Sequence, residues 1–151
     1  MQTITPFLWF DNNAEEAMNF YTAIFKDSQI VSTMPGPDGT LMGGTFALNG
    51  QEFMVLNGGP MFNFTPAISF FVKCETQAEV DHYWDKLSDG GSEEPCGWLK
   101  DKFGLSWQII PNKLSELIGH PDREKAGRAI QAMLQMKKID IATLQAAFEG
   151  K

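Results

Sequence analysis

Residues 40–57, TLMGGTFALNGQEFMVLN, form the stretch from which the fold follows. Two segments rich in β-branched and aromatic residues, 40–48 and 52–57, flank the dipeptide Asn49-Gly50. Both central residues of a type I′ turn have positive φ, which asparagine and glycine adopt with little strain. This stretch therefore predicts two antiparallel strands joined by a tight hairpin.

The residues before this hairpin predict a strand, a helix and a further strand. Residues 3–10 and 29–34 have the apolar and β-branched character of strands. Between them, apolar residues recur at helical spacing from Ala14 to Phe25, with Asn12 or Asn13 placed as the N-cap. Residues 1–57 thus form a first βαβββ module.

The same order of elements recurs further along the chain. Residues 67–74 predict a strand, 76–87 a helix, and 93–96, 98–100 and 105–110 short strands. Residues 66–111 therefore form a second βαβββ module, and the fold class is α+β with a duplicated unit. From the length we expect residues 1–151 to make a single domain.

The C-terminal part, residues 112–151, predicts a helical extension. Its helices are amphipathic, and Asp122 and Asp140 stand where N-caps are expected. Because each helix has an apolar face, the extension must pack on an apolar surface. That surface is either the sheet of the same chain or that of a second chain.

Composition and charge limit the classes of partner. The chain has 19 acidic and 12 basic residues, a formal charge of −7, which repels polyanions, so no nucleic-acid partner is expected. No apolar run approaches the roughly 20 residues that span a membrane, so no membrane partner is expected either. The first residues lack a secretory signal, and Cys74 and Cys96 are then most simply reduced thiols. These features predict a cytoplasmic protein.

Four segments resemble the PhnB-like branch of the vicinal oxygen chelate superfamily, which includes glyoxalase I, bleomycin-resistance proteins and extradiol dioxygenases. They are PFLWF at 6–10 followed by AEEA at 14–17 and Phe20-Tyr21, GWLKD at 97–101 with Phe103-Gly104, SWQI at 106–109, and AMLQMKKIDI at 132–141. The resemblance implies paired modules whose curved sheets surround a pocket, usually in a homodimer. Members of this branch are often labelled 3-demethylubiquinone-9 3-methyltransferase.

The sequence does not favour methyl transfer. A methyl donor of the adenosyl-methionine type is normally held by a glycine-rich turn between a strand and a helix. Here Gly39 falls between predicted strands, Gly43 and Gly44 lie within one, and Gly90-Gly91 follows a helix. We therefore expect no methyltransferase activity and predict no cofactor.

The sequence also does not favour a metal centre. In metal-dependent relatives the ligands project from the opening and last strands of each module; carried over by position, they fall near Pro6, Ala67, Met54 and Gln108. Only Gln108 could ligate, through a neutral amide oxygen, and one weak ligand does not hold a divalent ion. The two histidines, His82 and His120, lie on and after predicted helices. No metal is expected, nor metal-dependent glyoxalase or dioxygenase activity.

A small-molecule pocket is the remaining candidate site. Since side chains alternate along a strand, we expect the pocket to be lined by Leu8, Met54, Ser69, Trp98 and Gln108, with Gln108 orienting the ligand. The first hypothesis is a metal-free small-molecule-binding protein acting as a homodimer. The alternatives are a metal-independent isomerase or lyase of the same fold, with an acid or base that the sequence does not identify, and a dimeric interaction module whose lining residues fill a closed core.

Overall fold

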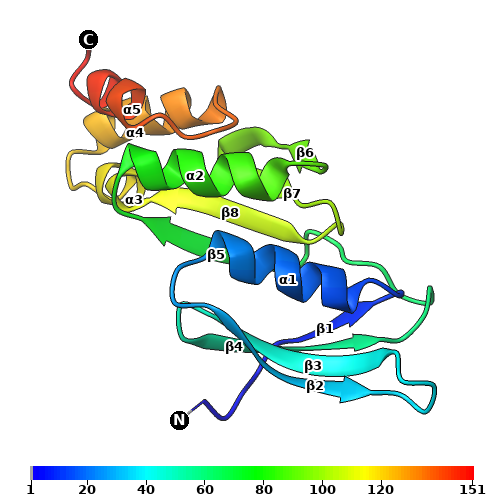
Figure 1. Cartoon of the computed structure of the whole chain (residues 1–151). Helices are drawn as coiled ribbons and strands as arrows, with labels where there is room; N and C mark the ends of the chain where they lie inside the picture. Colours follow the sequence, from blue (N-terminus) through cyan, green and yellow to red (C-terminus); the bar gives the residue numbers. More distant parts are fainter. Residues whose placement is uncertain (1) are drawn as a thin grey trace. The chain divides into compact units, whose positions relative to one another are not determined.

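The computed structural model describes residues 2–151. These residues fall into two compact units, one ending at Asn63 and one running from Phe64 to Lys151. Each unit contains one four-stranded mixed sheet with a helix packed on it (Figure 1). The predicted α+β fold class with two βαβββ modules and C-terminal helices is therefore confirmed.

The first unit has the order βαβββ. Its elements are β1 (Phe7–Phe10), α1 (Ala14–Ile24), β2 (Gln29–Pro35), β3 (Leu41–Leu48) and β4 (Gln51–Asn57). In the sheet the strand order is β1-β4-β3-β2, with β1 parallel to β4 and the other neighbours antiparallel. The predicted hairpin joins β3 to β4, and Asn49 and Gly50 have φ of 49° and 86°, as a type I′ turn requires.

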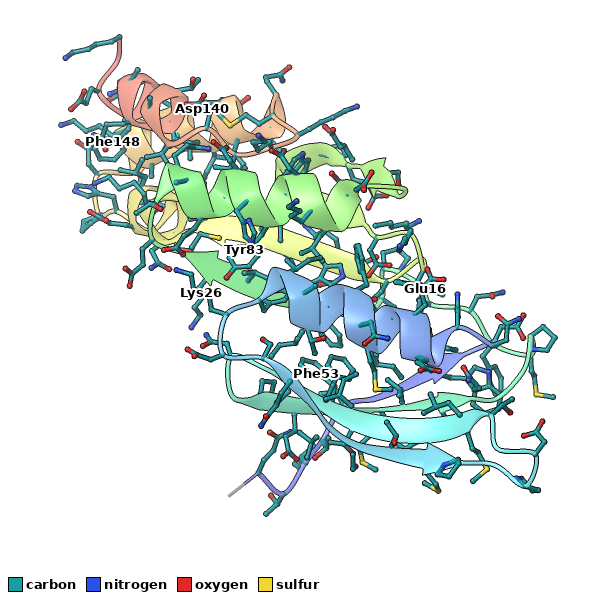
Figure 2. The ribbon with its side chains drawn as sticks, viewed as in Figure 1. Glu16, Lys26, Phe53, Tyr83, Asp140 and Phe148 are labelled. Carbon is teal, nitrogen blue, oxygen red and sulfur yellow. The ribbon has the colours of Figure 1, made fainter. Side chains whose placement is uncertain are left out.

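An aromatic stack fixes α1 on one face of this sheet. The ring of Tyr21 on α1 stacks on Phe46 of β3 at 5.9 Å, and Phe46 stacks on Phe53 of β4 at 5.2 Å. Phe53 points from its strand toward α1 (Figure 2). The helix face predicted from the apolar spacing is thus the buried one.

The N-terminus of α1 is capped differently from the prediction. Asn13 stands at the N-cap position, but its side chain makes no capping hydrogen bond. Instead, Oδ1 of Asn57 accepts a hydrogen bond from the amide of Ala14 at 2.9 Å, while its Nδ2 donates to the carbonyl of Leu41 at 3.1 Å. The capping group therefore comes from the end of β4, a contact between residues far apart in sequence.

The second unit repeats the topology of the first. Its βαβββ elements are β5 (Ser69–Cys74), α2 (Gln77–Ser88), β6 (Ser92–Glu93), β7 (Trp98–Lys100) and β8 (Ser106–Pro111), with a 3₁₀ turn, η1 (Pro95–Gly97), before β7. The strand order β5-β8-β7-β6 corresponds to β1-β4-β3-β2. The opening strand is again parallel to the last one.

Three C-terminal helices complete the second unit, α3 (Asn112–Ile118), α4 (Arg123–Leu134) and α5 (Ile141–Phe148). The two predicted caps are confirmed, since Asp122 accepts from the amide of Lys125 and Asp140 from the amide of Thr143. The helices pack in cis through an apolar cluster of Ile110, Leu114, Leu117, Ala129, Ile139, Leu144 and Phe148. Of the two surfaces that the sequence left open for these helices, the structure shows them packed on the same chain.

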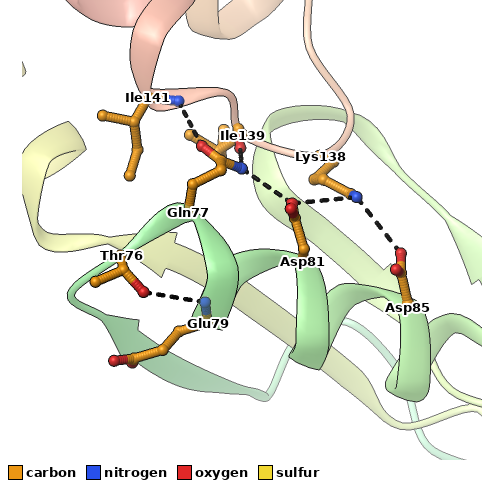
Figure 3. Close-up of polar contacts among 8 residues, drawn as sticks. All are labelled: Thr76, Gln77, Glu79, Asp81, Asp85, Lys138, Ile139 and Ile141. Atoms are coloured by element: carbon orange, nitrogen blue, oxygen red, sulfur yellow. Dashed lines mark hydrogen bonds and ion pairs between the residues drawn. The ribbon is translucent and has the colours of Figure 1, made fainter.

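Polar contacts hold the α4–α5 connection on the second unit (Figure 3). The side chain of Gln77 donates to the carbonyl of Ile139 at 3.0 Å and accepts from the amide of Ile141 at 2.8 Å. Lys138 lies 3.3 Å from Asp81 and 3.4 Å from Asp85, both on α2. The connection is therefore fixed to α2 by hydrogen bonds and ion pairs as well as by apolar packing.

Backbone contacts fix the same connection to η1. The amides of Cys96 and Gly97 donate to the carbonyls of Met136 and Lys137, each at 2.8 Å. Cys96 and Gly97 both have left-handed backbone conformations, with φ of 63° and 84°.

Within residues 2–151, no helix is both long and apolar enough to cross a membrane.

Candidate functional site

One face of the second sheet is covered by α2 and the other carries the candidate site. Phe70, Leu99, Trp107 and Ile109 point toward α2, whose Val80, Trp84 and Leu87 are buried. Because side chains alternate along a strand, the opposite face carries Ser69, Phe71, Trp98, Lys100, Ser106 and Gln108. We refer to these six residues as the Gln108 face.

The pairing of the strands arranges these six residues in two parallel rows across the sheet. In the first row Ser69 is paired with Ser106, and Ser106 with Lys100. The second row contains Phe71, Gln108 and Trp98, in the same strand order. Next along β8, Ile110 belongs to the apolar cluster with the C-terminal helices, so that cluster covers the end of the strand beyond Gln108.

A hydrogen bond fixes the amide of Gln108. Its Nε2 donates to Oγ of Ser69 at 3.0 Å. The carbonyl oxygen of the same amide makes no hydrogen bond within residues 2–151 and is an available acceptor. Ser106, in the adjacent row, is fully buried, and its Oγ has no hydrogen-bond partner in the described part of the chain.

The structure brings together three of the five predicted pocket residues. Ser69, Trp98 and Gln108 lie on the Gln108 face, where Trp98 is the direct cross-strand neighbour of Gln108. Met54 lies in the first unit, on the face of the sheet opposite α1, and is 38% exposed. The predicted partnership of Met54 with Gln108 therefore stays a prediction.

Leu8 lies on the other side of its sheet from Met54. It is paired with Val55, whose side chain shares the α1-facing side with Phe53, and it is buried there. The residue of β1 beside Met54 is Phe7, which is 54% exposed. An error of one position along a strand transfers a side chain to the opposite face, so Leu8 belongs to the core and not to the candidate site.

Two members of the Gln108 face, Phe71 and Lys100, were not predicted from the sequence. Phe71 is the cross-strand neighbour of Gln108, and Lys100 is the cross-strand neighbour of Ser106. The signal that identifies them is the alternation of side chains along a strand, since Phe71 lies two residues after Ser69 and Lys100 two residues after Trp98.

The residues on the Gln108 face do not fit a divalent metal ion. Their donors are one neutral amide oxygen and two hydroxyls, beside the ammonium group of Lys100. Divalent ions are held in proteins by carboxylate, imidazole or thiolate ligands in sets of three or more. Within residues 2–151, no group of three or more His, Cys, Asp or Glu side chains could hold an ion.

The strand-to-helix turns do not fit an adenosyl methyl donor either. The turn between β1 and α1 contains Asp11, Asn12 and Asn13, and the turn between β5 and α2 contains Glu75 and Thr76. Neither turn contains the glycines that let a backbone approach a nucleotide closely. We therefore derive no chemistry through such a donor.

The distinctive segment GWLKD with Phe103-Gly104 has a structural role at Asp101. This carboxylate is only 2% exposed. Its Oδ1 accepts from the amides of Phe103 and Leu105 at 2.9 and 3.1 Å, and its Oδ2 accepts from the indole Nε1 of Trp107 at 2.9 Å. Asp101 thus fixes the turn that places β7 beside β8, and with it the rows of the Gln108 face.

The two cysteines have different environments. Burial, with the charge of Glu79 as a smaller cause, raises the pKa of Cys74 to about 12, which keeps this thiol protonated. Cys96 is partly exposed in η1. Neither thiol lies on the Gln108 face.

The first unit has a separate cleft of about 520 Å³ beside the N-terminus of α1. It is lined by Asn12, Glu15, Gly36, Pro37, Asp38, Thr40, Leu41, Met42 and Asn57. Hydrogen bonds from the side chain and amide of Thr40 lower the pKa of Asp38. The polar groups of Asp38 and Asn57 are thus already engaged within the protein, and none of the predicted pocket residues lines this cleft.

Comparison with known proteins gives one family. The sequence model of the family described as 3-demethylubiquinone-9 3-methyltransferase matches residues 2–110, which leaves the extension, including the segment 132–141, outside the match. A PhnB protein from Bacillus cereus, named for the same family, is 43% identical; the match covers 73% of this chain and 99% of that chain, with a TM-score of 0.67. None of the curated proteins matches the chain.

Two more distant structures share the fold. A protein from Pseudomonas aeruginosa is 18% identical, with 74% of this chain and 98% of that chain covered and a TM-score of 0.61. A fosfomycin resistance protein from Listeria monocytogenes, in complex with Mn(II) and a dihydroxypropylphosphonic acid, is 17% identical, with 71% and 90% covered and a TM-score of 0.52. The chain belongs to the 3-demethylubiquinone-9 3-methyltransferase family, the PhnB-like branch of the vicinal oxygen chelate superfamily.

Proposed function

We propose that this protein binds a small organic molecule without a metal ion, on the Gln108 face, and acts by sequestering or sensing it. The observation that carries the proposal is the hydrogen bond from Gln108 to Ser69. It fixes the amide in one orientation and leaves its carbonyl oxygen available between Phe71 and Trp98. A fixed polar group between aromatic side chains is the usual composition of a small-molecule site.

The donor set of this face supports a metal-free site, since it offers only neutral oxygens and one cation. It also supports binding rather than catalysis. A general acid or base must reach the substrate, and Lys100 is the only titratable group among the six residues. An isomerase or lyase would need a further group contributed from elsewhere.

Native mass spectrometry of the protein purified from its own host tests the proposal. We expect a retained small molecule at one copy per chain and no divalent ion. Exchange of Gln108→Leu should remove most of the retained molecule, whereas Gln131→Leu, on the exposed surface of α4, should leave it in place. Retention unchanged by Gln108→Leu, or a stoichiometric divalent ion, contradicts the proposal, and conversion of the identified molecule would favour the isomerase or lyase.

We also propose that the chain forms a homodimer. The support is the apolar character of the sheet face opposite α1 in the first unit, where Phe7 and Met54 are neighbours and both are exposed. Exposed apolar side chains gathered on one face are typical of contact surfaces. The same native mass spectrum reports the mass of the assembly, and a monomer at micromolar concentration contradicts this part of the proposal.

A further inference from the structure

The two rows of the Gln108 face differ in chemistry. The row Ser69–Ser106–Lys100 offers two hydroxyls and an ammonium group, while the row Phe71–Gln108–Trp98 offers two aromatic rings on either side of an amide. Successive rows on one face of a strand are about 6.6 Å apart, two residues at the strand rise. A ligand that spans both rows therefore meets a polar end and a flat apolar end.

The hydroxyl of Ser106 is a buried polar group without a hydrogen-bond partner in the described part of the chain. It is fully buried, and within residues 2–151 no group bonds to its Oγ. Buried hydroxyls are nearly always hydrogen-bonded, so an unpaired one is a feature of the Gln108 face that requires an explanation. Its cross-strand neighbours are Ser69 on one side and Lys100 on the other.

Lys100 supplies a cation that makes no hydrogen bond through its ammonium group within residues 2–151. Its Nζ lies 3.9 Å from Oε2 of Glu94, beyond hydrogen-bond length, and the two side chains are 39% and 30% exposed. An ion pair of this length at a half-exposed position is weak. A second anion could therefore displace Glu94 from the ammonium group.

We propose that the ligand of the Gln108 face is a small carboxylate with a flat apolar body. Its carboxylate lies against Lys100 and the hydroxyl of Ser69, beside the buried hydroxyl of Ser106, and its body lies against Phe71 and Trp98 over the amide of Gln108. This inference rests on the proposed function and adds the chemical class of the ligand to it. The formal charge of the chain, −7, repels anions at long range, so recognition of the carboxylate depends on these short-range contacts.

The probe for this proposal is benzoate, with benzamide as its neutral isostere. Both are titrated into the ¹⁵N-labelled full chain, and the indole signal of Trp98, assigned through Trp98→Phe, is followed. We expect saturable shifts with benzoate in the millimolar range and binding of benzamide weaker by about fivefold, the difference that a charge-assisted hydrogen bond gives.

Three variants test the role assigned to Lys100. Lys100→Met should weaken benzoate binding by about fivefold and leave benzamide unchanged. Glu94→Gln removes the competing carboxylate and should tighten benzoate binding by about twofold. Lys113→Met is the matched control, because Lys113 lies in the same unit, is 36% exposed and pairs with Glu116, yet is outside the Gln108 face. The spectrum of each variant also reports whether the fold is retained.

Absence of a saturable Trp98 shift, equal binding of benzoate and benzamide, or benzoate binding unaffected by Lys100→Met would each overturn the inference. These outcomes are separate from failure of the proposed function. A neutral molecule retained from the host and lost on Gln108→Leu would leave that function standing while the carboxylate is rejected. Benzoate binding that depends on Lys100 but not on Gln108 would support recognition of a carboxylate and reject the role of Gln108 in the proposed function.

Discussion

Asp101 is a buried carboxylate whose two oxygens accept hydrogen bonds from the amides of Phe103 and Leu105 and from the indole N–H of Trp107. Each of these donors is satisfied only while the oxygen that it contacts remains an acceptor. Its role is to set the geometry of the β7–β8 turn. The sequence shows the motif around it but not this role, because the bond to Trp107 depends on how the strands pair.

Exchange of Asp101→Asn should destabilise the protein by about 2–3 kcal/mol, since an amide nitrogen would face one of the three N–H donors. Urea unfolding followed by tryptophan fluorescence measures this difference. Asp89→Asn is the control, because Asp89 is exposed at the end of α2, and it should change the free energy of unfolding by less than about 0.5 kcal/mol. Equal unfolding midpoints for the two variants would contradict the role given to Asp101.

Cys74 and Cys96 should react at very different rates. The pKa of Cys74 is raised to about 12 by burial, so almost no thiolate is present at neutral pH, whereas Cys96 is partly exposed. Iodoacetamide at about pH 8 should add one group to the native protein, at Cys96, and two groups in denaturant; peptide mapping locates them. Two adducts at similar rates in the native protein would show that Cys74 is accessible.

The same pKa makes stability depend on pH. In the unfolded chain Cys74 ionises near its ordinary value of 9.0, whereas in the folded protein it stays protonated up to about 12. The unfolded state therefore loses a proton first, and the free energy of unfolding falls as pH rises through that window. Cys74→Ala should flatten this part of the pH profile in urea titrations, and an unchanged slope would contradict the assignment.

At the scale of elements, the sequence predicted correctly the features that depend on residues close together in the chain. The Asn49-Gly50 turn, the helix faces and the caps at Asp122 and Asp140 depend on neighbours within a few residues, and all are confirmed. The cap of α1 by Asn57 and the place of Leu8 depend on which strands pair and in what register. No local pattern contains that information, which explains why the cap by Asn57 was missed and Leu8 was assigned to the pocket.

Gln77 links α2 to the C-terminal extension through both ends of its amide. Gln77→Glu keeps an acceptor for the amide of Ile141 but removes the donor to Ile139 and to Asp81. It also places a negative charge beside Asp81. The pKa of Asp81 is lowered mainly by the hydrogen bond from Gln77; burial opposes this effect, and Lys138 lowers the pKa further. The extension should therefore open more often.

Hydrogen exchange of the Ile141, Cys96 and Gly97 amides measures this opening, and about a tenfold faster exchange is expected for a loss of roughly 1.4 kcal/mol. Gln131→Glu, exposed on α4, should leave these rates unchanged. An acidic residue in the first turn of α2 favours that helix itself, so fraying of α2 would not account for the result. Slower or equal exchange in Gln77→Glu would contradict the proposed link.

At the scale of the whole molecule, the chain is a duplicated module with an addition to one copy only. The family match ends at residue 110, and the three helices that follow pack on the second unit. The added helices also cover Ile110 at one end of β8, so they limit the Gln108 face to the rows before it. The sequence predicted the helices and their apolar faces, but the choice between the same chain and a second chain depended on contacts that only the structure contains.

Removal of the extension should therefore affect the two units unequally. A chain ending at Pro111 would expose Ile110 and lose the carbonyls of Met136 and Lys137 that pair with the η1 amides. Amides of β8 should lose protection against hydrogen exchange, whereas those of β3 and β4 keep theirs, because none of the residues removed belongs to the first unit. The Gln108–Ser69 hydrogen bond lies within β5 and β8, so ligand retention should fall together with β8 protection. Protection of β8 unchanged by the truncation would mean that the second module is stable without its helices, and equal loss in both units would mean that they unfold as one.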